Sequence, residues 1–159
     1  MTQALQLVLE PEFIALYHRA EHRQPLGLIA LSHTSLTARF FNGDTINPAR
    51  LEQAIEWAED CIQAARLQLP RDSLLYTDED DLRTLALASG VSPSEDMVLH
   101  VDAVEATFSR LAMQAFGQSA QQESLPRSAR FFATVVFTRE LMHHLHFPQI
   151  HVVNKFRSK

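Results

Sequence analysis

The segment from Pro126 to Leu145 most constrains the fold, because it is predicted to be a helix that is apolar on nearly all sides. Its apolar cluster contains Phe131, Phe132, Val135, Val136 and Phe137. A helix that is hydrophobic all round is a buried helix. We therefore expect this segment to be the central helix of a core or a contact between subunits, and not a cofactor site.

The composition is typical of a single folded domain. The chain has 159 residues, of which 46% are hydrophobic and 21% are charged. A chain of this length buries about 68–70% of its unfolded surface. We expect one domain over residues 1–154 and a solvated basic tail over residues 155–159. The net charge of −5 argues against a nucleic-acid partner.

Targeting features and cysteine usage indicate a cytoplasmic protein. The first residues lack the basic start and long apolar run of a secretion signal, and no segment reaches the ~20 apolar residues of a membrane span. The single cysteine, Cys61, cannot form an internal disulfide. It lies beside the apolar stripe of an expected helix, so we expect it to pack in the core rather than to act as a nucleophile.

Hydrophobic periodicity predicts a strand-rich beginning and a helix-rich remainder. Three short strands, at residues 5–9, 13–19 and 26–31, predict an antiparallel meander. Asn47 followed by Pro48 predicts the start of an amphipathic helix that ends before Pro70. The later elements are expected as a strand at 73–77, a helix from Asp78 to Ser89, a strand or approach segment at 97–101, a helix from Asp102 to Phe116, a polar loop at 117–124 and a strand at 150–153.

Residues 34–41 fit two structures. The alternation of apolar residues over 36–41 predicts a strand, whereas Ser32 as an N-cap and Gly43 as a stop predict a short helix. Periodicity does not decide between them. In either case the chain is a mixed α/β domain.

Glycine is scarce, and this removes a class of chemistry. The chain has four glycines, all far apart, whereas an average protein carries about 7% glycine. Loops that wrap phosphate use successive glycines so that backbone N–H groups can approach the anion. No G-x-G-x-x-G, G-x-x-x-x-G-K-[ST] or G-x-S-x-G motif is present.

An ordered series of segments resembles the exopolyphosphatase and guanosine pentaphosphate phosphohydrolase (Ppx/GppA) family. The matching segments are the LTARF sequence at 36–40 followed by a proline-capped helix, VLHVDAVEATFSRL at 98–111, and LPRSARFFATVVFTRELMHHLHFPQIHVV at 125–153. The resemblance covers most of this chain but only the second half of the family's catalytic module. It implies an RNase H-like domain of the actin-like ATPase type, and it favours a helix at residues 34–41.

The departures from the family pattern predict that its catalysis is lost. Where the resemblance implies an Asp followed by glycines and Ser/Thr, this chain has the sequence LEPEF at 9–13. Where it implies a Gly-Gly-Thr turn, this chain has Glu79, Asp80 and Asp81. Both changes replace N–H donors by carboxylates, and like charges ~4 Å apart repel by about 1 kcal/mol in water and by more in a cleft. Polyphosphate or a nucleotide would be repelled.

The acidic residues have two interpretations. Together they could hold Mg²⁺ or Mn²⁺ through oxygen ligands. Alternatively, they are the negative charges that the macrodipole favours in the first turn of a helix; this second interpretation predicts no metal and no cofactor. The candidate cluster comprises Glu10, Glu12, Asp78, Glu79, Asp80 and Asp81.

The histidines near the end of the chain resemble a metal motif only superficially. Glu140 and His143 form one E-x-x-H pair, but di-iron bundles need a second copy and two further carboxylates. His146 stands where the family has a helix-ending glycine, so a solvated helix end is expected. The other histidines are expected on surfaces or strand edges: His18, His22, His33, His100 and His151.

Two functions remain at this stage. The first is a non-catalytic binding or regulatory domain that has lost its phosphate loops and that associates with itself or with another protein, without nucleic acid or membrane. The alternative is a small metal-dependent phosphohydrolase acting on polyphosphate or a guanosine polyphosphate. Convergence of the acidic residues on one cation would distinguish the two.

Overall fold

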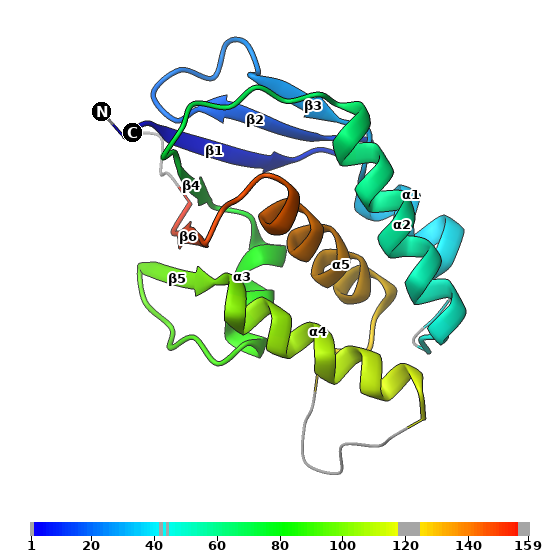
Figure 1. The fold of residues 1–159 in the computed structure, drawn as a ribbon. Helices are drawn as coiled ribbons and strands as arrows, with labels where there is room; N and C mark the ends of the chain where they lie inside the picture. The colour runs from blue at the N-terminus through cyan, green and yellow to red at the C-terminus, as the bar shows by residue number, and fades with distance from the viewer. Residues whose placement is uncertain (1, 42, 44, 118–124, 156–159) are drawn as a thin grey trace.

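Six strands form one mixed sheet in the order β3-β2-β1-β4-β6-β5 (Figure 1). The computed structural model describes residues 2–41, 43, 45–117 and 125–155. The elements are β1 (Ala4–Leu9), β2 (Ile14–His18), β3 (Gly27–Ile29), α1 (His33–Phe40), α2 (Pro48–Ala64), β4 (Leu74–Thr77), α3 (Asp80–Ala88), β5 (Asp96–His100), α4 (Val101–Ala115), α5 (Ala129–His144) and β6 (Gln149–Val153). The predicted α/β class is confirmed.

The first three strands form the predicted antiparallel meander. Leu7 lies opposite Leu16 in the β1–β2 pair, and β2 pairs antiparallel with β3. β1 and β4 pair in parallel, as do β4 and β6, while β5 is antiparallel to β6. The carboxyl ends of β1, β3, β4 and β6 therefore lie at one edge of the sheet, which we call the carboxyl edge.

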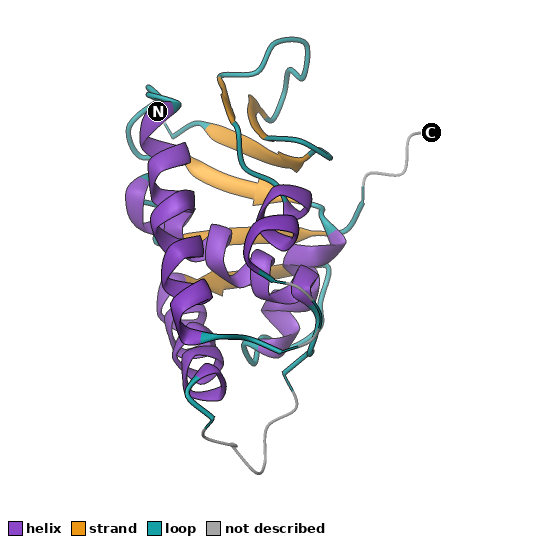
Figure 2. Cartoon of the chain, turned by 90° about the vertical axis from the view of Figure 1, so that its right-hand side faces the viewer, coloured by secondary structure: helices purple, strands orange, loops and turns teal. Residues whose placement is uncertain are grey.

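Helix α5 is the centre of the core, as its all-round apolar character predicts. Phe132, Val135 and Phe137 are fully buried, and α5 packs against α1, α2, α3 and α4. Strand residues such as Leu5 and Ile150 join the same apolar cluster, so helices and sheet share one core (Figures 1 and 2). No helix among the described residues is long and apolar enough to cross a bilayer.

Residues 33–40 are helical, which settles the open alternative. Ser32 caps α1 through a reciprocal capping box with Ser35, so local capping overrides the strand-like alternation. Residues 96–100 form strand β5. The expected loop at 117–124 lies almost wholly outside the described residues, as do the last four residues of the expected basic tail.

Three predicted helix starts were wrong by one to three residues. α3 is capped by Glu79 rather than Asp78, and α4 by His100 rather than Asp102, in both cases without a side-chain hydrogen bond. α5 begins at Ala129 rather than at Pro126, because the Ser128 hydroxyl accepts the backbone N–H of Phe131 at 3.1 Å. A serine at the N-cap has an extended backbone, and its hydroxyl accepts a backbone N–H of the first turn, so the helix begins directly after it.

Candidate functional site: the carboxyl edge of the sheet

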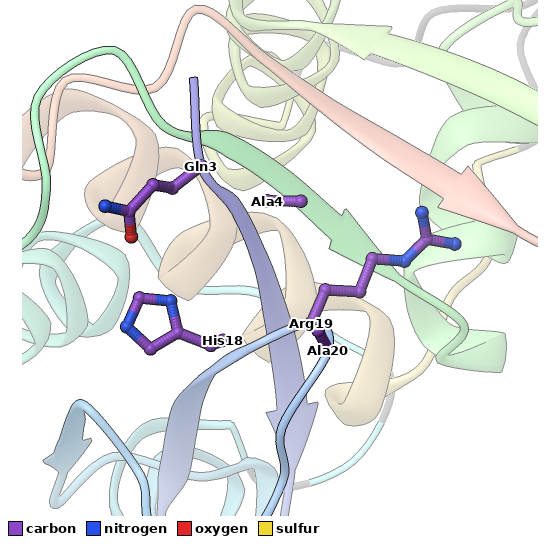
Figure 3. A pocket seen from close by; sticks show the side chains of 5 residues that line it. All are labelled: Gln3, Ala4, His18, Arg19 and Ala20. Carbon is purple, nitrogen blue, oxygen red and sulfur yellow. The ribbon is translucent and has the colours of Figure 1, made fainter. Parts of the chain in front are cut away.

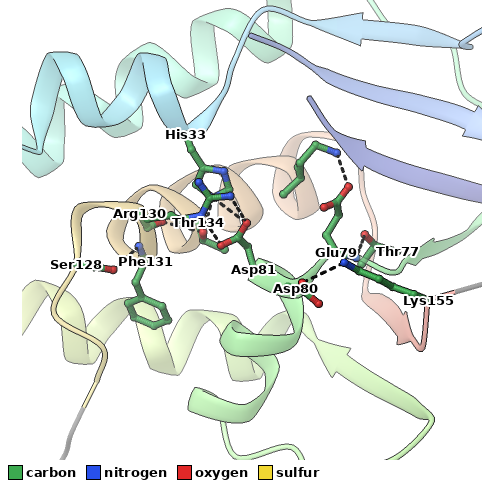
Figure 4. Close-up of polar contacts among 11 residues, drawn as sticks. His33, Thr77, Glu79, Asp80, Asp81, Ser128, Arg130, Phe131, Thr134 and Lys155 are labelled. Atoms are coloured by element: carbon green, nitrogen blue, oxygen red, sulfur yellow. Dashed lines mark hydrogen bonds and ion pairs between the residues drawn. The ribbon is translucent and has the colours of Figure 1, made fainter. Parts of the chain in front are cut away.

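The starts of three helices meet at the carboxyl edge (Figure 4). α1 follows β3 and α3 follows β4, while α5 runs back along the sheet before β6. Each helix start carries a partial positive charge from its unpaired N–H groups. This is therefore the place where an anion would bind most readily in a fold of this kind.

The chain's own Asp81 occupies this region. It receives two hydrogen bonds from Arg130, one from Nε to Oδ1 at 2.8 Å and one from Nη2 to Oδ2 at 2.7 Å. Partial burial acts to raise the pKa of Asp81, but the bonds from Arg130 and the nearby positive charges outweigh it and hold this pKa below its ordinary value. The α3 carboxylate is thus ionised and bound side-on to the guanidinium of α5.

His33 lies partly buried beside this ion pair. Its Nε2 lies 2.7 Å from the hydroxyl oxygen of Thr134 and 3.9 Å from Oδ2 of Asp81, and its ring meets Phe137 edge-on. The Thr134 hydroxyl donates to the carbonyl of Arg130 at 2.8 Å, so the ring N–H at Nε2 donates to that hydroxyl. Burial lowers the pKa of His33 from 6.5 to about 4, with Asp81 opposing and Arg130 reinforcing the change. The imidazole is therefore neutral at pH 7.

Glu79 ties the end of β1 to the start of α3. Its Oε1 accepts the backbone N–H of Leu9 at 3.0 Å. Burial raises the pKa of Glu79, and the Leu9 N–H only partly opposes this effect. Thr77 adds a parallel link, because its hydroxyl donates to the carbonyl of Leu7 at 3.1 Å.

The six predicted acidic residues lie at the same edge but do not converge on one point. Glu10 and Glu12 lie in the turn between β1 and β2, which is closed by the N–H of Glu10 bonding to the carbonyl of Phe13. Asp78 lies between β4 and α3. Asp80 points away from Asp81, and its Oδ2 accepts a hydrogen bond from the Lys155 ammonium at 3.1 Å. Among the described residues, no three of these carboxylates bring ligand atoms within 4.8 Å of one another.

Sequence reasoning missed the partners of these acids, which are His33, Arg130 and Lys155. It also missed Thr134, which bonds to His33. Placing His33 on a surface or strand edge was wrong, since only 11% of its side chain is exposed. His151 also differs from expectation, because it lies on the inner strand β6 and stacks on Tyr76 with ring centres 4.7 Å apart. Arg130 offered a weak signal, because the macrodipole disfavours an arginine in the first turn of a helix and a nearby acid would offset that cost.

The helix end at residues 143–146 is arranged differently from the E-x-x-H pattern. His143 bonds to Glu105 of α4, whereas the Oε1 of Glu140 lies 3.8 Å from His144. His146 has a φ of 61°, the left-handed conformation that glycine adopts most easily at a helix end. The expectation that His146 occupies a glycine position is confirmed.

A surface pocket of about 490 Å³ lies at the other end of β1 (Figure 3). It is lined by Gln3, Ala4, His18, Arg19 and Ala20. The Arg19 guanidinium lies 3.9 Å above the ring of Tyr76. Since β1 starts at Ala4 and ends at Leu9, this pocket is separate from the carboxyl edge.

Known structures share this fold. A structure of the Ppx/GppA phosphatase of Aquifex aeolicus, type II variant, superposes with a TM-score of 0.70 at 14% identity, covering 96% of this chain and 53% of that chain. An exopolyphosphatase-like protein superposes with a TM-score of 0.66 at 13% identity, covering 96% of this chain and 56% of that chain. An exopolyphosphatase from Cytophaga hutchinsonii superposes with a TM-score of 0.51 at 14% identity, covering 96% of this chain and 53% of that chain.

No protein-family model matches the sequence, and no curated protein matches it. At identities near 14% the likeness concerns the fold, because one fold hosts many functions. The chain spans about half the length of the structures that it matches. It therefore has the fold of half of a Ppx/GppA-type protein, an RNase H-like domain of the actin-like ATPase type.

Proposed function

We propose that this chain is a non-catalytic binding or regulatory domain built on the fold of a Ppx/GppA phosphatase. One observation carries the proposal: the groups at the carboxyl edge that could hold phosphate are bound by the chain's own carboxylates. Arg130 gives two hydrogen bonds to Asp81, and the N–H of Leu9 bonds to Glu79. A phosphate would have to displace both carboxylates and then remain beside them.

We expect a partner on the face of the sheet that points away from the core helices. The strand positions that alternate with the core residues carry both polar side chains, such as Gln6 and His151, and apolar side chains that do not belong to the core cluster. Leu28 and Leu74 lie on this face by register and are 49% and 36% exposed. Exposed apolar residues on one face favour a protein contact, so we propose self-association or binding of another protein there.

The first experiment measures phosphate release from polyphosphate and from guanosine pentaphosphate in Mg²⁺. The expected result is no release above the buffer control. Thermal unfolding with Mg²⁺, with and without either substrate, tests binding directly: a ligand at 100 times its dissociation constant adds about 2.7 kcal/mol of stability. We expect no shift in the melting temperature.

A clear result in the other direction would support the small metal-dependent phosphohydrolase. Release of phosphate, or a Mg²⁺-dependent shift, contradicts the non-catalytic proposal. If the Asp78→Asn, Asp80→Asn double variant abolishes that shift, the acidic residues hold the cation. If the variant leaves it unchanged, these two acids are not ligands.

A further inference from the structure

We infer that Glu59, Glu140 and His144 form a site for a divalent transition-metal ion of the zinc class. Glu59 lies on α2, and the other two residues lie on the last turns of α5. One ligand atom from each residue lies within 4.8 Å of the others, and in the described part of the chain this is the only group with that property. The site lies at the end of α5, whereas Arg130 of the carboxyl edge lies at its start, and the inference does not depend on the proposed function.

The distances suit a small ion after a slight contraction. Nε2 of His144 lies 3.9 Å from Oε2 of Glu59 and 3.8 Å from Oε1 of Glu140. Ligands bound to zinc at about 2.0–2.2 Å in a tetrahedral site are about 3.4 Å apart. The two distances from His144 therefore have to shorten by about half an ångström, and the two carboxylates, now within 4.8 Å of each other, have to approach as well. The i,i+4 spacing already places Glu140 and His144 on one face of α5.

Glu140 provides a second, independent reason to expect a cation. Its side chain is only 5% exposed, and its neighbours at residues 131–138 and 141–142 of α5 are buried as well. Arg139 donates to Oε2 at 3.0 Å. The other oxygen, Oε1, points toward His144 but accepts no hydrogen bond from any described residue. A carboxylate that is largely withdrawn from water needs positive charge close to it, and a metal ion would add to the charge that Arg139 supplies.

The donor set selects the class of metal. Two carboxylates and one imidazole match the nitrogen and oxygen ligands of Zn²⁺, whereas Mg²⁺ and Ca²⁺ prefer oxygen alone. Glu59 and His144 are 41% and 29% exposed, so solvent can reach the fourth position. A metal here would clamp the middle of α2 to the end of α5.

The test is titration of the EDTA-treated full chain with Zn²⁺ by calorimetry, supported by the visible absorption of bound Co²⁺. We expect one ion per chain. Glu59→Gln and His144→Ala should each weaken binding at least about tenfold, since even changes to residues behind the ligands cost that much. The matched controls are Glu56→Gln, exposed on the same helix as Glu59, and His143→Ala, whose side chain bonds to Glu105 instead. Both controls should bind as the wild type does.

Two outcomes overturn the inference. One is the absence of stoichiometric Zn²⁺ binding by the wild-type chain. The other is a loss in His143→Ala or Glu56→Gln as large as that in the two ligand variants, which would indicate scattered surface binding. Circular dichroism of each variant confirms folding, and Glu59→Gln gives a ligand variant that leaves the buried Glu140 untouched.

Discussion

Replacing His33 with glutamine should remove a large part of the protein's sensitivity to mild acid. The neutral imidazole of His33 is enclosed by Thr134, Phe137 and the Asp81–Arg130 pair. Folding lowers its pKa from 6.5 to about 4, so the unfolded chain binds a proton that the folded chain refuses. Between these two pH values the unfolded state holds more protons, and stability must fall as the pH falls.

The size of the effect follows from the two pKa values. Each pH unit between 6.5 and 4 costs about 1.4 kcal/mol of unfolding free energy. From pH 7.5 to pH 5, His33 alone should therefore remove about 2 kcal/mol. This is a sizeable share of the 5–15 kcal/mol that stabilises a typical domain. A glutamine amide can still donate to the Thr134 hydroxyl but does not titrate.

The assay is urea unfolding at pH 7.5, 6 and 5, followed through the fluorescence of Trp57. The quantity of interest is the loss of stability on acidification in the wild type minus that in His33→Gln, because this difference cancels the other seven histidines. We expect about 2 kcal/mol. His100→Gln, which changes an exposed histidine, should leave the wild-type pH dependence in place. Parallel pH profiles for the wild type and His33→Gln would refute the assignment.

Two further predictions concern packing. Phe137→Ala, at a position with 0% exposure, should lower the free energy of unfolding in urea by about 3–5 kcal/mol. The control Phe116→Ala, at a position 72% exposed, should change it by no more than about 0.5 kcal/mol. Equal losses in the two variants would contradict the central place of α5. Gly27→Ala should destabilise the protein by at most about 1–3 kcal/mol, because the added Cβ would meet the end of the flexible Leu67 side chain. Most of this loss should be relieved when Leu67→Ala is introduced with it, an outcome that a purely conformational role of the glycine does not allow.

Much of the fold could be predicted because the signals are local. The alternation over residues 5–9 and the Asn47-Pro48 pair each specify an element from a few neighbouring residues. The apolar circumference of residues 131–137 similarly requires burial, whatever the rest of the chain does. Residues 36–41 were ambiguous for the opposite reason: their alternation is the same in both structures, and the deciding bond lies outside them, between Ser32 and Ser35.

The contacts at the site could not be predicted in the same way. Asp81 and Arg130 are 49 positions apart, and His33 and Thr134 are 101 apart, so only the topology brings them together. Charge counting identified Glu79 and Asp81 as acidic but gave no information about which cation or N–H each would bind. The sequence also did not determine which histidine of α5 lies beside Glu140. His143 at i+3 and His144 at i+4 are both neighbours of Glu140 on a helix surface.

The carboxylates at the carboxyl edge explain how three helix starts can meet there without an anion from solution. Three helix starts directed at one place create a positive potential that must be met by some anion. In this chain Asp81 lies in the first turn of α3 and pairs with Arg130 of α5, and Glu79 accepts the N–H at the end of β1. An anion bound from solution would gain little there, because its place and its donors are already used. Under the function proposed above, the carboxylates that would exclude phosphate also stabilise this edge, and binding through another surface is the function that we expect.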